Sequence, residues 1–135
     1  MKFSLINVPL SCFPSDNKLD SMPLKKRISI KKQLKFDAEI LTKEWLRFHR
    51  IKLSSLSKSN PLLKSQVQTV LTVYLKQGST LDIHNLSIKH FLDQIVSMGI
   101  ISDDSVKYVP KSVAEFGGYN KLSSFANFEL LEIEK

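Results

Sequence analysis

Three aspartates and one lysine in the second half of the chain are the residues best suited to do chemistry. Asp82 lies between a predicted strand and a predicted helix, Lys89 lies one turn into that helix, and Asp103 and Asp104 follow its end. Carboxylates that meet at one point repel each other unless a cation neutralises them, and hard oxygen ligands suit Mg²⁺ or Mn²⁺. The pattern predicts a metal site for phosphodiester chemistry, in which Lys89 offsets charge on the phosphoryl oxygens.

The segment between the aspartates decides whether they can meet. A helix of about fourteen residues is ~21 Å long, so Asp82 and Gly99 are predicted at opposite ends of the helix. Five extended residues span ~17 Å, so a segment after Gly99 that runs back along the helix would return Asp104 to the vicinity of its start. The alternative is a structural role, with Asp82 as a helix-start acid and Asp103–Asp104 in a surface turn.

The periodicity of apolar residues predicts one α+β domain over residues 1–135, ordered β-α-β-α-β-β, with helices packed on a mixed sheet. Strands are predicted at 2–8, 67–76, 106–116 and 125–133, helices at 33–53 and 85–98, and a turn at Gly117–Gly118. Asn85 is the expected N-cap of the second helix and Gly99 its left-handed end. Trp45 lies on the apolar stripe of the first helix and is predicted to be a core residue.

Positive charge is concentrated in the first half of the chain. The formal net charge is +7, and turn formers followed by lysines predict a mobile basic loop over 9–32, while serines predict a linker over 54–65. Basic residues in and after this loop are candidates to hold phosphates: Lys25, Lys26, Arg27, Lys31, Lys32, Lys35, Lys43 and Arg47. Cations that hold a phosphate backbone beside acids that hold a metal would suit a nucleic-acid enzyme.

Composition also excludes several classes. The single Cys12 cannot form an internal disulfide, which favours a reducing intracellular compartment. No window approaches the ~20 apolar residues of a membrane-spanning helix, and the N-terminus is interpreted as a strand rather than a signal. His49 and His90 lie among charged residues on predicted helices, which indicates surface or structural roles.

Residues 82–106 resemble the RusA-like Holliday junction resolvases. The family pattern is Asp-x-Asp-Asn-Leu-x-Lys, a short helix with an Asp, then Gly and Asp-Asp before a strand. The chain has DIHNLSIK, Asp93, Gly99 and DDSV in the same order. The segment Pro14-Ser15-x-Asn17 after the first strand is similar to the family's opening segment.

This resemblance implies a Mg²⁺-dependent or Mn²⁺-dependent endonuclease. It would act as a homodimer that resolves four-way DNA junctions by paired nicks, with no small-molecule cofactor and no membrane. Asp82 resembles the first family acid, Lys89 the lysine and Asp104 the distal acid; Asp103 and His84 complete the expected metal ligands. The resemblance also implies a cytoplasmic, nucleoid-associated protein, for which a phage or prophage origin would be usual.

One family carboxylate is missing. His84 occupies the position of the second Asp if DIHN is aligned on the pattern, and Ile88 then takes the place of the lysine; a frame shifted by one keeps Lys89 but puts Asn85 at the acid. Imidazole is a poor Mg²⁺ ligand, and Asn brings oxygen without charge. The alternative hypotheses are a degenerate member that binds branched DNA without cutting, and a protein-interaction module whose charge serves solubility.

Overall fold

The computed structural model describes residues 2–133. Strands and helices follow in the order β1 (Lys2–Val8), α1 (Asp16–Asp20), α2 (Leu24–Phe48), β2 (Val67–Lys76), α3 (Lys89–Ser97), β3 (Lys111–Asn120) and β4 (Phe125–Glu132). Three short 3-10 turns accompany them, η1 (Leu10–Cys12), η2 (Leu53–Ser55) and η3 (Ile83–Asn85). The α+β class is confirmed, and the predicted order holds once the five-residue α1 is added.

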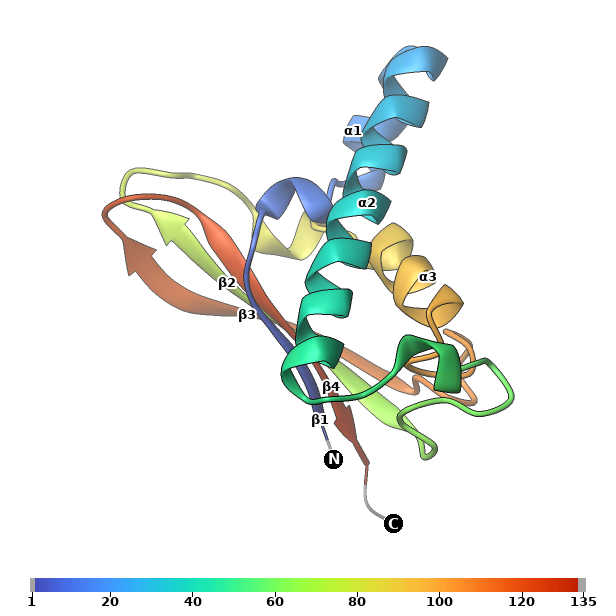
Figure 1. Ribbon diagram of the computed structural model, residues 1–135. Coiled ribbons are helices and arrows are strands. Elements are labelled where there is room, and N and C mark those ends of the chain that lie inside the picture. The colour runs from blue at the N-terminus through green and yellow to red at the C-terminus, as the bar shows by residue number, and fades with distance from the viewer. Residues whose placement is uncertain (1, 134–135) are drawn as a thin grey trace.

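The four strands form one mixed sheet in the order β1-β4-β2-β3 (Figure 1). β2 and β3 are parallel and joined through α3, whereas β4 is antiparallel to both β1 and β2. The strand β2 is therefore central, with β-branched and apolar residues that suit a position between two neighbours. The ends of β2, β3 and β4 project beyond the helices, and the turn η3 lies at the base of this projection.

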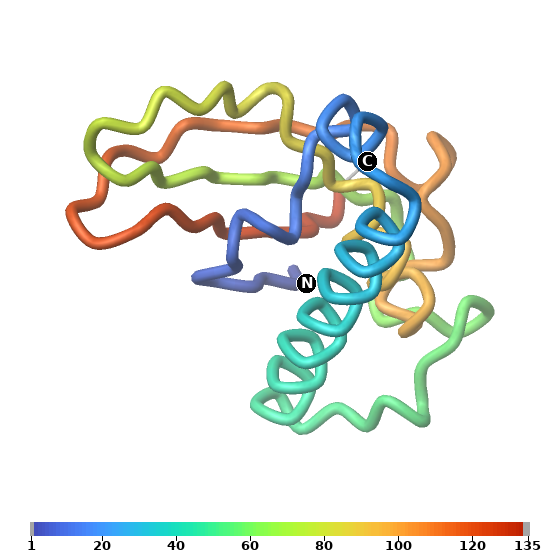
Figure 2. Tube along the Cα trace, turned by 90° about the horizontal axis from the view of Figure 1, so that it is seen from above, coloured from blue at the N-terminus to red at the C-terminus, as the bar shows by residue number. Residues whose placement is uncertain are grey.

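α2 and α3 pack together on one face of the sheet (Figure 2), and the core lies between them and the strands. Three fully buried phenylalanines join the layers: the ring centroid of Phe13 lies 5.0 Å from that of Phe91 and 6.2 Å from that of Phe128. Trp45 packs edge-on to Phe3 at 4.8 Å and is partly buried against the core, close to the predicted role.

Helix α2 is the longest element and begins nine residues before its predicted start. Residues 24–32 are helical rather than a loop, because Pro23 suits the position before the first turn and lysines are good helix formers. The helix ends at Phe48, and His49 and Arg50 follow it, with Arg50 at φ 58°. Within residues 2–133 no helix combines the length and the apolar character needed to cross a membrane.

Helix α3 is shorter than predicted. It begins at Lys89, with Ile88 rather than Asn85 at the N-cap position, because residues 83–85 form the separate turn η3. The predicted left-handed residue at its other end is confirmed, since Gly99 has φ 80°. An added Cβ at Gly99 would lie 2.7 Å from the backbone nitrogen of Ser57, so this position also needs the space that glycine leaves.

The edge strand β3 differs most from the prediction. Residues 106–110 lie before the strand, and Pro110 immediately precedes it, which leaves the β3 ladder intact. Gly117 and Gly118 lie inside β3 rather than in a turn. The β2–β3 register shifts here, since Val73 pairs with Phe116 and Tyr74 with Gly118, and an added Cβ at the unpaired Gly117 would lie 2.6 Å from the Tyr74 ring.

The predicted linker is held against the end of α3. The carbonyls of Gly99 and Ile100 accept hydrogen bonds from the N–H groups of Leu62 and Leu63, both at 2.9 Å. The Ser102 hydroxyl donates to the Lys58 carbonyl at 2.9 Å. The segment 54–65 is therefore an irregular connection that is tied to the rest of the fold.

The Cys12 thiol is fully buried and should be inert in the native protein. Burial raises its pKa to about 12, and the Asp37 carboxylate adds to the rise. At pH 8 we expect native Cys12 to react with a thiol reagent roughly a thousandfold more slowly than the protein in denaturant, because the thiolate fraction falls by about that factor. Because the unfolded thiol ionises first, stability should fall as the pH rises from about 9 toward 12. Equal labelling rates with and without denaturant would contradict the burial of this thiol.

Candidate nucleic-acid interface

The turn η3 carries the residues of the DIHN segment. β2 ends at Lys76, Gly78 turns the chain with φ 88°, and Asp82 caps the 3-10 turn by accepting a hydrogen bond from the His84 N–H at 3.0 Å. Asp82, His84 and Asn85 are all exposed. The Asp82 carboxylate therefore has a structural role as a cap and still keeps oxygens that face solvent.

A second segment faces this turn across a polar pocket. Ser15 caps α1 by accepting from the Lys18 N–H at 3.2 Å, which places Asp16 and Asn17 in the first turn of that helix. The pocket has a volume of about 330 Å³ and its walls are Ser15, Asp16, Asn17, His84, Asn85, Leu86 and Ser87. Its hydroxyl, carboxamide, imidazole and carboxylate groups can together donate and accept hydrogen bonds to a polar ligand.

His90 lies near this pocket and is more than a surface residue. Burial lowers its pKa, and Lys31 and Lys89 lower it further, whereas Asp93 and Asp16 act in the opposite direction. Charged groups from α1, α2 and α3 thus face one half-buried imidazole. A surface or structural role is predicted for His90 from its charged neighbours along the chain, which do not indicate that α1 and α2 approach it.

Asp103 and Asp104 lie beyond the other end of α3. The Asp103 carboxylate accepts from the Asp104 N–H at 2.8 Å, and this hydrogen bond lowers the pKa of Asp103. Burial raises the pKa of Asp104, and the charge and hydrogen bond of Asp93 raise it further, as does Asp103. Asp104 therefore pairs with Asp93, one turn before the end of the helix, and Asp82 is not among the groups that shift its pKa.

The predicted metal ligands are not gathered into one group. In residues 2–133 no three histidine, cysteine, aspartate or glutamate side chains are placed to hold a metal ion together. Asp82 and His84 lie just before Lys89, the first residue of α3, and Asp104 faces Asp93 in the middle of that helix. The Mg²⁺ or Mn²⁺ site predicted from Asp82, His84, Asp103 and Asp104 therefore stays a prediction.

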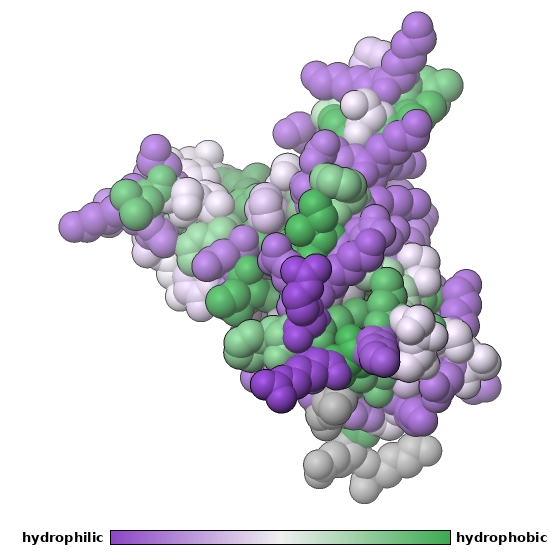
Figure 3. Space-filling model, in the orientation of Figure 1, coloured by the Kyte–Doolittle hydropathy of each residue, from purple (hydrophilic) through white to green (hydrophobic). Residues whose placement is uncertain are grey.

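The predicted phosphate-binding residues lie along one helix. All eight residues belong to α2. Arg27 and Lys31 are half-buried, and the other six are exposed: Lys25, Lys26, Lys32, Lys35, Lys43 and Arg47. Lys43 forms an ion pair with Glu39 at 2.9 Å. Figure 3 shows hydrophilic side chains along α2 up to its projecting N-terminal end. The basic segment is therefore a ridge along a helix rather than a mobile loop.

No protein-family model matches the chain, and no curated protein matches it.

Proposed function

We propose that the chain binds branched DNA through a face formed by the N-terminal half of α2 and the polar pocket. The observation that carries this proposal is the meeting of two distant segments in one pocket. Ser15, Asp16 and Asn17 line it from one side, and His84 and Asn85 line it from the other. Both segments belong to the parts of the sequence that resemble the RusA-like resolvases, and their proximity supports the proposal.

Electrostatics supports a phosphate ligand for this face. Exposed lysines on the first three turns of α2, such as Lys25, Lys26 and Lys32, lie on a helix whose end projects from the body of the protein. Lysine ammonium groups contact phosphates without reading sequence, which suits recognition of DNA shape. Two copies of the face in a homodimer would match the two-fold symmetry of a four-way junction.

Binding without cleavage is the form of this function that the geometry supports best. Within residues 2–133 the ligands expected for Mg²⁺ or Mn²⁺ do not form a group of three, and His84 stands where the resemblance implies a carboxylate. We therefore propose a junction-binding relative of the resolvases. Paired nicks by the same face are the second candidate, favoured by the Asp93–Asp104 carboxylate pair.

The test compares a labelled four-way junction with a linear duplex of the same sequence, at several salt concentrations and with Mg²⁺ or Mn²⁺ present. We expect junction binding to be at least tenfold tighter than duplex binding, to weaken steeply with salt, and to leave the DNA intact. Paired nicks that disappear in Asp104→Asn would instead establish a resolvase. Binding that is equal for both DNAs, or indifferent to salt, would refute the proposal and indicate a protein-interaction module.

A further inference from the structure

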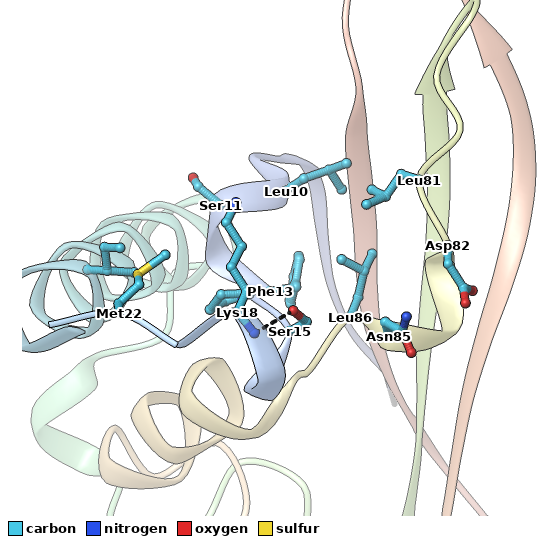
Figure 4. A pocket seen from close by; sticks show the side chains of 12 residues that line it. Leu10, Ser11, Phe13, Ser15, Lys18, Met22, Leu81, Asp82, Asn85 and Leu86 are labelled. Atoms are coloured by element: carbon cyan, nitrogen blue, oxygen red, sulfur yellow. Dashed lines mark hydrogen bonds between the residues drawn. The ribbon is translucent and has the colours of Figure 1, made fainter. Parts of the chain in front are cut away.

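A second pocket lies on the other side of the turn η3 and is mainly apolar. Its volume is about 480 Å³, within the range of roughly 300–1,000 Å³ typical of ligand sites. Its apolar walls come from η1 and the residue after it, from the connection between α1 and α2, from α2, and from the segment around η3: Leu10, Phe13, Met22, Ile30, Leu81 and Leu86. Figure 4 shows the Leu10, Leu81 and Leu86 side chains pointing toward one another across it.

This apolar pocket continues into the polar pocket. Ser15, Asn85 and Leu86 line both of them, so a single ligand can extend from one into the other. Such a ligand needs one flat, poorly hydrated part and one polar part. Lys18 and Asp82 bring opposite charges to the apolar pocket, and Asp16 adds a carboxylate to the polar pocket. A negatively charged group of the ligand is therefore favoured only next to Lys18.

We propose that the apolar pocket takes one unpaired nucleobase of a branched or single-stranded DNA, while the sugar of that nucleotide lies in the polar pocket and its phosphate lies at Lys18. This inference rests on the proposed function for its ligand. A base at a branch point is already partly unstacked, so its removal from the helix costs less than in a duplex. Burial against Leu10, Leu81 and Leu86, which keep accessible surface, then offsets that cost.

The lining predicts which bases are accepted. Apolar walls stabilise every base in a similar way, because each base has a flat apolar surface. At the junction of the two pockets Asn85 has both a donor and an acceptor in its carboxamide. The pocket should therefore hold purines and pyrimidines with similar affinity, and select for an unpaired state rather than for a sequence.

Occupancy can be measured with the fluorescent base 2-aminopurine, placed at each branch nucleotide of a junction, at the same positions of a duplex, and in a short single strand. We expect the emission to rise at least twofold on binding for one branch nucleotide and for the single strand, and to stay constant in the duplex. Unchanged emission in both the junction and the single strand would overturn the inference, whatever the junction affinity.

Whether the base lies in the apolar pocket is tested by combining a change in the protein with a change in the DNA. Leu81 is 44% exposed and Met22 is half-buried, so Leu81→Trp and Met22→Trp should fold and fill the pocket from opposite walls. An abasic branch nucleotide should weaken binding of the unchanged protein roughly tenfold and of either variant hardly at all. Leu122→Trp is the matched control, because Leu122 is 87% exposed and lies outside both pockets. It should keep the tenfold difference.

The two proposals fail in different ways. If junction and duplex bind equally but the single strand still raises the emission, the pocket assignment stands and the proposed function falls. If the junction is preferred and both tryptophan variants keep the full tenfold difference, the proposed function stands and the base lies elsewhere.

Discussion

Replacing Lys25, Lys26, Lys32 and Lys35 together by alanine should weaken junction binding by roughly 10³-fold at about 0.1 M salt. Each lysine that contacts a phosphate releases about one counterion from the DNA, so the slope of log K against log salt should fall by roughly one per lysine. All four side chains are exposed on α2, and alanine is the best helix former, so the fold should be retained. The measurement is a salt titration of junction binding by the variant and the unchanged protein.

Lysines outside the proposed face provide the control. Lys76 and Lys111 are exposed at the two ends of the β2–β3 pair, away from α2, and their replacement by alanine removes positive charge without touching the ridge. We expect less than a threefold loss for this pair. The double variant could instead reduce the slope of log K against log salt by as much per lysine as the quadruple variant does. The positive charge of the protein would then act on DNA as a general field, and α2 would not be the contact surface.

Gly99→Ala should destabilise the protein by roughly 3 kcal/mol. Gly99 has φ 80°, a conformation that costs an L side chain free energy. The added Cβ would also lie 2.7 Å from the Ser57 nitrogen and 2.9 Å from the Leu56 carbonyl carbon. These neighbours are backbone atoms of the tied segment 54–65, so they cannot move aside without loss of its hydrogen bonds. Urea unfolding measures the difference.

Gly78→Ala separates the cost of the left-handed backbone conformation from the cost of the close contacts. Gly78 has φ 88°, but nothing lies within 4 Å of an added Cβ, so only the conformational cost of about 1 kcal/mol remains. A loss at Gly99 no larger than the loss at Gly78 would show that the connection yields to the methyl group. The segment 54–65 would then be a loose linker, as its serine-rich composition suggests.

The parts of the fold that were predicted correctly depend on local sequence. β2 has the predicted bounds 67–76, since its β-branched and aromatic run is bounded by polar turn residues. The start of α2 was missed because a run of lysines is typical of a solvated loop, although lysine is also a good helix former. The position of Gly117 inside β3 depends on Tyr74 of the neighbouring strand, which no local pattern reveals.

The candidate site shows the same limit. The sequence singled out Asp82, and the structure places this residue at the wall of the apolar pocket. Chain length allowed Asp104 to return to within about a turn of the helix start, and in the structure Asp104 faces Asp93, one turn after Lys89. The contribution of Asp16 and Asn17 to the same pocket as His84 depends on how α1 packs, which spacing along the chain does not predict.

The pairing of β1 with β4 has a consequence for synthesis in the cell. β1 and β4 are joined by the bond from the Asn7 N–H to the Asn127 carboxamide, across 120 residues. Ribosomes add about 5–20 residues per second, so β1 waits on the order of ten seconds for its partner to emerge. During that time the apolar face of β1 is open to chaperones and to neighbouring nascent chains. Yield should therefore depend on chaperone capacity and growth temperature more strongly than on the stability of the finished fold.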